Sequence, residues 1–226
     1  MEFMLDTVDL EKIRYYQAIL PLAGVTSNPT ILKQAGKIDF YDHLKEIQSI
    51  IGAASLHVQV VGETAEEIIA DAEQILAHLG KEVYIKIPVN EAGLTAIKQL
   101  KKQAVRITAT AIYTEIQGYL AIAAGADYLA PYYNRMENLN IDAADIIGAL
   151  VAEITRTKSN SKVLAASFKN VAQLNTACRV GAHAITAGPD IFDQAFKMPA
   201  IQQAVTDFHN DWRETFSVEN VKELTE

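Results

Sequence analysis

The stretch VYIKIPV, residues 83–89, has the composition of a buried β-strand but carries Lys86 at its centre. Side chains alternate between the two faces of a strand. The four aliphatic residues of this stretch therefore share one face, and Lys86 lies on the other face between Tyr84 and Pro88. An ammonium group loses favourable hydration when it is buried without a partner. We therefore expect the Lys86 face to line a polar interior.

Similar strand-like runs recur along the whole chain and alternate with helical stretches. They lie at residues 3–6, 24–28, 57–62, 106–112, 127–132, 162–168 and 183–188, which with residues 83–89 makes eight. Between them, residues 64–80 show helical periodicity, with a capping box of Thr64 and Glu67 at the start and Gly80 at the end. Eight such units predict an α/β fold of the (β/α)8 TIM-barrel type. An open doubly wound sheet is the alternative, but no G-x-G-x-x-G motif follows the first strand.

Composition sets the domain organisation and excludes some partners. The 226 residues contain no low-complexity linker, so one domain over residues 1–226 is expected, with a long helix and tail over about 199–226. The net charge of −8 argues against nucleic-acid and anionic-membrane partners. There is no apolar run of about 18 residues, the length that a membrane span needs, and no signal-peptide pattern. We expect a cytoplasmic protein in which Cys178 is a small packing residue.

Polar residues share the inward faces and carboxyl ends of the other expected strands. They are Asp6, Thr26, Asn28, Gln59, Thr108, Thr110, Tyr132 and Ser167. Barrel enzymes place their active sites at this end of the strands. A structural ion pair between Lys86 and Asp6 would also explain the lysine. The convergence of so many polar groups favours chemistry instead: a desolvated lysine has a lowered pKa, and its neutral amine forms Schiff bases with carbonyl compounds.

Metal-dependent chemistry is not indicated. The five histidines, at positions 43, 57, 78, 183 and 209, lack the spacing of metal ligands. We therefore predict no metal and no cofactor, and interpret each histidine as a surface or packing residue. A Schiff-base lyase or transferase is the leading class.

Seven motifs, in order and close to the expected spacing, resemble the small transaldolase family over nearly the whole chain. They are LDT (5–7), GVTSNPTIL (24–32), VQV (58–60), VYIKIPV (83–89), TATAIY (108–113), APYYNR (130–135) and LAASFK (164–169). The chain is most similar to the fructose-6-phosphate aldolase branch of that family. The resemblance implies a (β/α)8 barrel with the Schiff-base lysine on the fourth strand, where Lys86 falls.

The same resemblance implies roles for the other residues. Asp6 is the acid/base near the C4 hydroxyl of the sugar, whereas Gln59, Thr110 and Tyr132 position a water and move protons at the imine. Substrate binding is assigned to Thr26, Asn28, Arg135, Ser167 and Lys169. Within that set, Arg135 and Ser167 match a phosphate clamp, and Lys169 stands where many transaldolases carry a second arginine.

The implied activity is class I aldol cleavage or formation of fructose 6-phosphate from dihydroxyacetone and glyceraldehyde 3-phosphate. Transaldolases proper carry glutamate at the place of Gln59 and phenylalanine at that of Tyr132, so these two residues favour the aldolase. Transfer of dihydroxyacetone between sugar phosphates, as in the pentose phosphate pathway, is the alternative, and a non-catalytic sugar-phosphate-binding barrel is a third reading. Thr108, Ala109 and Tyr133 depart from the family pattern and leave the preferred acceptor open.

The expected C-terminal helix carries an aromatic stripe of Phe208, Trp212 and Phe216. This stripe could pack on the chain's own barrel. Small members of the family form pentamers and decamers in which this helix reaches a neighbour, and large aromatics are enriched in interface cores. We therefore expect a homo-oligomer.

Overall fold

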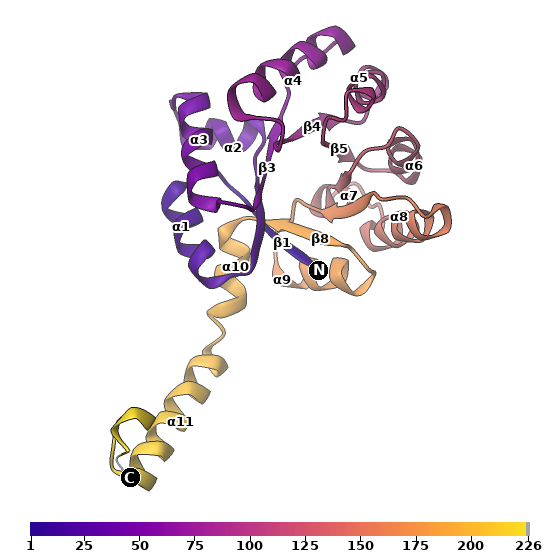
Figure 1. Cartoon of the computed structure of the whole chain (residues 1–226). Helices are drawn as coiled ribbons and strands as arrows, with labels where there is room; N and C mark the ends of the chain where they lie inside the picture. Colours follow the sequence, from indigo (N-terminus) through magenta and orange to yellow (C-terminus); the bar gives the residue numbers. More distant parts are fainter. Residues whose placement is uncertain (225–226) are drawn as a thin grey trace.

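A computed structural model describes residues 1–224, in which eight parallel strands form a closed barrel in chain order (Figure 1). The strands are β1 (Glu2–Asp6), β2 (Leu22–Thr26), β3 (Ser55–Gln59), β4 (Tyr84–Pro88), β5 (Ile107–Ile112), β6 (Tyr128–Pro131), β7 (Lys162–Ala165) and β8 (Ala184–Ala187). Strand β1 pairs with β8 as well as with β2, which closes the barrel. The (β/α)8 prediction is confirmed, and the open sheet is excluded.

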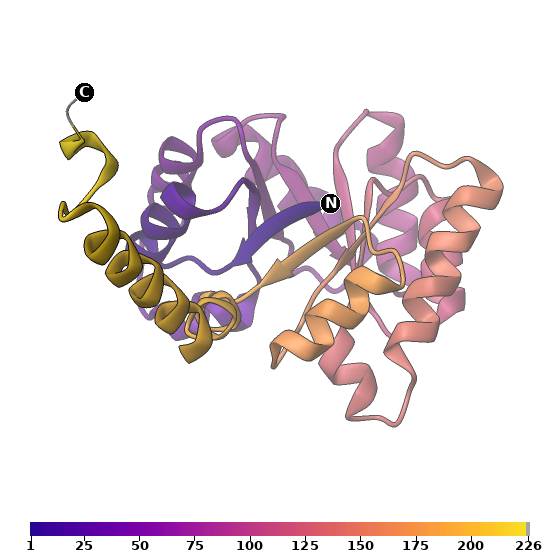
Figure 2. The same cartoon turned by 90° about the horizontal axis from the view of Figure 1, so that it is seen from below.

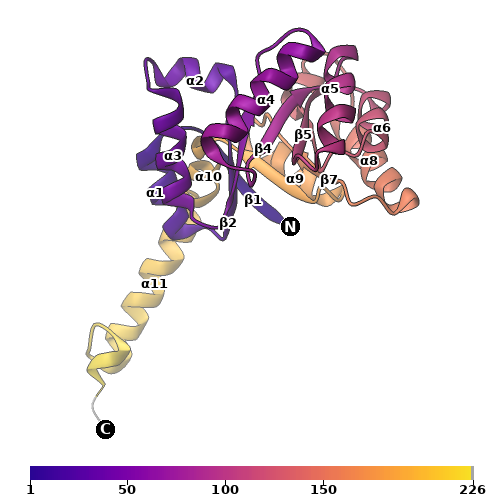
Figure 3. The ribbon, with the colours of Figure 1, turned by 45° about the horizontal axis from the view of Figure 1, so that its top comes forward.

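Helices surround the barrel on its outer side (Figure 3). They are α1 (Leu10–Ile19), α2 (Pro29–Ala35), α3 (Phe40–Ile51), α4 (Ala65–Leu79), α5 (Glu91–Lys102), α6 (Glu115–Ala123), α7 (Tyr133–Glu137), α8 (Ala143–Thr157), α9 (Val171–Arg179), α10 (Pro189–Phe196) and α11 (Pro199–Phe216), with a 3-10 turn at Val221–Glu223. The predicted capping box of α4 is present, because Thr64 and Glu67 bond each other's main-chain N–H groups. Most of the other helices also begin at an Asp, Asn or Thr that caps the first turn.

The hydrophobic core lies mainly between the barrel and this ring of helices. Ile85 and Ile87 of β4 are fully buried in it, as the alternation of VYIKIPV predicts. A smaller apolar cluster of Met4, Tyr128, Leu164 and Ala184 fills the amino-terminal half of the barrel interior. The interior is therefore closed by side chains at one end, which leaves the carboxyl ends of the strands as the place for a site.

Two strands differ from the sequence-based boundaries at points that matter for the site. Strand β2 covers Leu22–Thr26 rather than residues 24–28, because Asn28 caps α2 and Pro29 occupies its first turn. Strand β7 ends at Ala165, and Ser167 has a φ of 64°, in the left-handed region that non-glycine residues rarely adopt. Asn28 and Ser167 thus lie in loops above the barrel rather than on strands.

Helix α11 covers Pro199–Phe216, as expected, but it extends away from the barrel (Figures 1 and 3). Seen from below, it lies at the left edge of the molecule (Figure 2). None of its residues is buried, and Phe208 is 71% exposed. Packing of the aromatic stripe on the chain's own barrel is therefore wrong for the described residues. The expected domain and tail end at residue 226, and residues 225–226 lie outside the part that the structure describes. Within residues 1–224, no helix has the length and apolar character of a membrane span.

A pair of glycine substitutions tests how the end of β4 is packed. A Cβ built on Gly93, in the first turn of α5, would lie 1.9 Å from the carbonyl oxygen of Pro88, whereas one on Gly148 in α8 meets nothing within 4 Å. We expect Gly93→Ala to lower the free energy of unfolding by about 1–3 kcal/mol through overpacking. Gly148→Ala should raise it by up to about 1 kcal/mol through helix propensity. Denaturant titrations measure both, and equal stabilities of the two variants would contradict the packing described.

Candidate active site

A cavity of about 200 Å³ opens at the carboxyl ends of the strands. Seven of the residues expected at the site line it: Asp6, Asn28, Lys86, Tyr132, Arg135, Ser167 and Lys169. They come from β1, β4, the loops that follow β2, β6 and β7, and helix α7. The cavity therefore brings together side chains from distant parts of the sequence around one lysine.

Lys86 is only 4% exposed and points into the barrel interior. Its Nζ donates a hydrogen bond of 2.7 Å to the main-chain carbonyl of Ser27. Burial lowers the pKa of Lys86, and the Coulombic attraction of Asp6 opposes this in part. In the described part of the chain Lys86 makes no ion pair with Asp6, so the purely structural ion pair considered from the sequence is not formed. The amine is thus held by a neutral acceptor and is shifted towards its nucleophilic form.

Asp6 stands at the end of a chain of hydroxyl groups. Thr26 Oγ1 donates to Asp6 Oδ1 at 2.7 Å, and Thr26 Oγ1 lies 2.7 Å from Thr186 Oγ1 on β8. Because the Thr26 hydroxyl hydrogen is used on Asp6, Thr186 is the donor of the second bond. Burial raises the pKa of the Asp6 carboxyl, against the opposing effects of Lys86, Thr26 and Arg135. A carboxylate of this kind binds a proton more readily than an exposed one.

Tyr132 is fixed by a hydroxyl and by a cation. Thr110 Oγ1 donates to Tyr132 Oη at 3.0 Å, and the Arg135 guanidinium lies 4.8 Å from the centre of the Tyr132 ring. Burial raises the pKa of Tyr132, so that the phenol keeps its proton at neutral pH. Tyr132 can therefore act as a proton donor towards the cavity.

Positive charge collects at one side of the cavity. Arg135 from α7 and Lys169 from the loop after β7 both line it, and Ser167 lies between β7 and Lys169. The Ser167 carbonyl accepts from the main-chain N–H of Asn134, which joins this loop to the helix that carries Arg135. Guanidinium, ammonium and hydroxyl groups in one place suit a phosphate.

Three expected site residues do not line the cavity. Thr26 and Thr110 lie behind it and bond Asp6 and Tyr132, respectively. Gln59 is paired in register with Lys86, but it is among the residues that line a neighbouring cavity of about 500 Å³ next to α2 and α4. Within residues 1–224, Gln59 Oε1 is buried without a hydrogen-bond partner. Asn28, which does line the site, accepts from Ile31 N through its Oδ1 and so caps α2.

Sequence reasoning missed three buried residues next to the site: Ser27, Thr186 and His57. Ser27 bonds Lys86 through its main chain, and no side-chain pattern signals such a contact. Thr186 lies on the inward face of β8 and lines the cavity, so strict period-two alternation could have found it. His57 was expected to be a packing or surface residue; it is fully buried inside the barrel, where its ring bonds two hydroxyl groups.

The described residues include no group of three or more His, Cys, Asp or Glu side chains placed to hold a metal ion. Cys178 is half-buried, and burial raises its pKa. Lys86 and Lys169 are the two amines that line the cavity, and Lys86 is the buried one.

Comparison with known proteins gives the same picture at the level of sequence and fold. The sequence model of the Transaldolase/Fructose-6-phosphate aldolase family matches residues 3–225. The chain is 57% identical over 225 residues to a probable fructose-6-phosphate aldolase of Streptococcus pneumoniae (strain ATCC 700669 / Spain 23F-1), covering 99% of this chain and 100% of that protein. The crystal structure of inosine 5′-monophosphate dehydrogenase from Legionella pneumophila superposes with a TM-score of 0.58 at 11% identity, over 84% of this chain and 58% of that one, and is similar in fold alone.

The coupling of Lys86 to Asp6 can be tested by titrating the lysine. We expect its amine to titrate below the ordinary lysine value of about 10.4. Asp6→Asn should lower its pKa further, because the opposite charge that favours the ammonium form is removed. The rate at which 2,4-pentanedione forms its absorbing adduct, followed against pH, measures this, with Lys86→Met as the blank.

Asp190→Asn is the matched control, since Asp190 lines the same cavity but does not shift the pKa of Lys86. Equal shifts in the two variants would contradict a specific pairing with Asp6.

Proposed function

Because the chain belongs to the transaldolase/fructose-6-phosphate aldolase family, we propose that it cleaves and forms fructose 6-phosphate as a class I aldolase, through a Schiff base on Lys86. The observation that carries this proposal is the buried Lys86 amine in a cavity that also presents Asp6, Tyr132 and Arg135. Each of these four groups supplies a function that the reaction needs: a nucleophile, a base, a proton donor and a phosphate ligand.

The reaction begins at the C2 ketone of the sugar. The lone pair of neutral Lys86 Nζ bonds to C2, and one of the two amine protons passes to the former ketone oxygen. An acid of the site, for which Tyr132 is placed, gives that oxygen a second proton, and it leaves as water. The product is an iminium, the protonated form of the imine, and its nitrogen keeps one N–H. This cation is the electron sink for cleavage of the neighbouring carbon–carbon bond.

Asp6 suits the next step as its base. Its carboxylate takes the proton of the C4 hydroxyl, the C4 oxygen forms a carbonyl, and the electrons of the C3–C4 bond move towards the iminium nitrogen. Glyceraldehyde 3-phosphate leaves, and an enamine of dihydroxyacetone remains on Lys86. The raised pKa of the Asp6 carboxyl supports this role, because the protonated product of the step is favoured inside the barrel.

Release of dihydroxyacetone needs a proton at C3 and a water at C2. Tyr132, held by Thr110, regains from the Asp6 carboxyl, through water, the proton that it gave up in the dehydration, and is placed to deliver it to C3. The phenolate left by this step takes a proton from the water that adds to C2, and the hydroxyl proton of the resulting carbinolamine returns to Lys86 Nζ as dihydroxyacetone leaves. The buried Gln59 Oε1, one strand away from Lys86, is an acceptor suited to holding a water. A neutral amide takes no proton from that water, so in this proposal Tyr132 carries the proton transfer.

The phosphate of the sugar is assigned to the side of the cavity with Arg135, Ser167 and Lys169. With the phosphate bound there, the distance from these residues to Lys86 Nζ determines which carbon of the sugar reaches the amine. The left-handed main chain at Ser167 supports a binding role, since strained backbone clusters at ligand sites.

One experiment tests the activity and separates it from transfer of dihydroxyacetone to another sugar. The purified chain is given fructose 6-phosphate with and without erythrose 4-phosphate, and free dihydroxyacetone is measured. We expect dihydroxyacetone to form without the acceptor, because water completes the reaction. Borohydride added during turnover should leave a reduced adduct on Lys86, identified by peptide mass, and Lys86→Met should lose at least about 10³-fold in rate.

Product that forms only when erythrose 4-phosphate is present would establish a transaldolase instead. Absence of any adduct on Lys86 would rule out both Schiff-base activities and leave a sugar-phosphate-binding barrel.

The same proposal includes assembly into a homo-oligomer in a cytoplasmic setting. Ile201, Val205 and Phe208 lie on one side of α11 and are 48%, 57% and 71% exposed. An apolar helix face that the chain's own barrel does not cover suits a second copy of the chain. The family resemblance gives a pentamer or a decamer as the expected form.

Sedimentation equilibrium tests the assembly. We expect a mass that is a multiple of the 24.8 kDa chain. Ile201→Ser combined with Phe208→Ser should shift that mass towards a single chain, because the buried apolar area of the interface is lost. Gln203→Ala, on the same helix, is the matched control and should leave the mass unchanged. A wild-type mass of 24.8 kDa would contradict the proposal.

A further inference from the structure

We infer that Ser27 is a catalytic residue whose main-chain carbonyl accepts the N–H of Lys86, first in the amine and then in the iminium, and that His57 is the positioning residue that aims this carbonyl. The inference rests on the proposed Schiff-base function and deepens it. It concerns the reacting nitrogen itself, to which none of the residues discussed above in catalytic roles is hydrogen-bonded.

The contact between Lys86 and Ser27 is short and buried. Lys86 Nζ lies 2.7 Å from Ser27 O, Ser27 is fully buried, and Lys86 is 4% exposed. Ser27 follows directly on β2 and precedes the cap of α2, so its carbonyl belongs to a segment held at both ends. A hydrogen bond in a low-dielectric interior is stronger than one in water.

Ser27 is clamped from behind by β3. Its main-chain N–H and its Oγ both donate to the carbonyl of His57, at 3.1 Å and 3.3 Å. Because the N–H and the hydroxyl of Ser27 share the His57 carbonyl as acceptor, rotation of the Ser27 main chain is restricted. The direction of the Ser27 carbonyl is therefore fixed. The serine hydroxyl is the part of this clamp that a substitution can remove.

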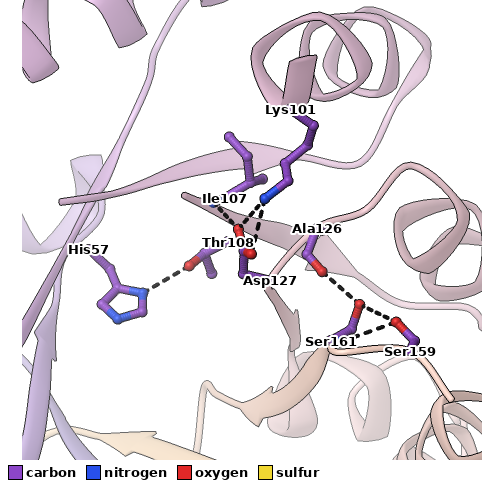
Figure 4. Close-up of polar contacts among 8 residues, drawn as sticks. All are labelled: His57, Lys101, Ile107, Thr108, Ala126, Asp127, Ser159 and Ser161. Carbon is purple, nitrogen blue, oxygen red and sulfur yellow. Dashed lines mark hydrogen bonds and ion pairs between the residues drawn. The ribbon is translucent and has the colours of Figure 1, made fainter. Parts of the chain in front are cut away.

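The position of His57 is fixed by two hydrogen bonds and a stacking contact of its imidazole ring. The Ser55 hydroxyl donates to Ala23 O at 3.1 Å, so Ser55 Oγ accepts from Nε2–H of His57 at 2.9 Å. Nδ1 is then the acceptor of the Thr108 hydroxyl at 2.8 Å (Figure 4). Stacking on Tyr84, with ring centres 4.5 Å apart, completes the fixation. This pattern assigns one neutral tautomer, and burial together with the charge of Lys86 keeps the pKa of His57 well below its ordinary value.

The chemistry at Lys86 Nζ explains what a fixed carbonyl contributes. A neutral amine that gives one N–H to Ser27 O has a restricted lone-pair direction, which helps its approach to the C2 ketone. After water leaves, the iminium nitrogen keeps a single N–H, and the same carbonyl accepts it. A hydrogen bond to a cation is stronger than one to a neutral group. The carbonyl therefore stabilises the iminium more than the amine.

The same contact affects the titration of Lys86. The ionisable groups around the amine are Asp6 from β1, His57 from β3, Tyr132 after β6 and Arg135 from α7. Lys169 after β7 and Asp190 from α10 line the same cavity. Since a carbonyl acceptor favours the ammonium over the amine, a loosened carbonyl lowers the pKa of Lys86 below its already lowered value. A purely structural role of Ser27 predicts no such shift.

Ser27→Ala, which removes the clamping hydroxyl but keeps the carbonyl, is the test. We expect kcat for fructose 6-phosphate cleavage to fall about ten- to hundredfold, with KM within about twofold. The acidic limb of the kcat/KM profile, which reports the free enzyme, should move to lower pH. Ser27→Thr restores the hydroxyl and should restore both. His57→Phe, which removes the two ring hydrogen bonds, should change kcat and the profile in the same directions by a smaller factor.

Ser161→Ala is the matched control. Ser161 is a buried serine whose hydroxyl donates to a main-chain carbonyl, that of Ala126, at 2.6 Å, in a network without Lys86 (Figure 4). It should leave kcat and the pH profile unchanged. If Ser27→Ala behaves like Ser161→Ala while the wild type still gives a borohydride adduct on Lys86, the inference fails and the proposed function stands. An unchanged His57→Phe variant overturns the assignment of His57.

A measurement on the wild type covers the case in which Ser27→Ala does not fold. Enzyme labelled with ¹⁵N-lysine and saturated with dihydroxyacetone should show an iminium N–H that exchanges with water much more slowly than that of a small-molecule iminium, because the proton is held by a buried carbonyl. Exchange at the rate of the small molecule would overturn the inference.

Discussion

The Lys86 amine lies inside a closed barrel, where the carbonyl of Ser27 takes the place of its hydration shell. Most features of the site follow from this burial. The cost of removing a cation from water falls on the charged form, so the amine is shifted towards neutrality, while Asp6, buried in the same interior, is shifted towards its protonated form. Two groups that would pair as ions at a surface are thus both shifted towards their neutral forms.

The barrel supplies this environment by the way its strands end. Loops that follow the strands turn directly into helices, and the residues that begin those helices lie above the barrel. Asn28 caps α2 and lines the cavity at the same time, and Tyr132 stands at the start of the short helix that carries Arg135. The first residues of these helices therefore line the cavity, and a shift of one helix start would move a side chain at its wall.

Sequence patterns predicted the parts of this arrangement that depend on periodicity. Alternation in VYIKIPV placed Lys86 inside and Ile85 and Ile87 outside, and the eight repeats gave the barrel. The patterns failed where a hydrogen bond overrides strand geometry. Asn28 leaves the strand because its side chain caps α2, and the role of Ser27 depends on a main-chain atom that every residue type possesses. Gln59 is paired in register with Lys86 but is not among the residues that line its cavity, which strand position alone does not reveal.

The fold by itself does not determine the chemistry. A dehydrogenase with 11% identity shares the barrel, so the same arrangement of strands and helices supports different reactions. What separates them is the set of polar side chains in the interior and at its mouths. In this chain the amino-terminal half of the interior is packed with Met4, Tyr128 and Leu164. The larger cavity of about 500 Å³ at the amino-terminal mouth, lined by Glu2, Tyr84 and Arg106, is not lined by Lys86. Apolar side chains fill the amino-terminal half of the barrel interior, and Lys86 lies towards the carboxyl-terminal end. His57 is packed among the residues of the amino-terminal half through its ring, and its main-chain carbonyl fixes Ser27, whose own carbonyl holds the Lys86 amine.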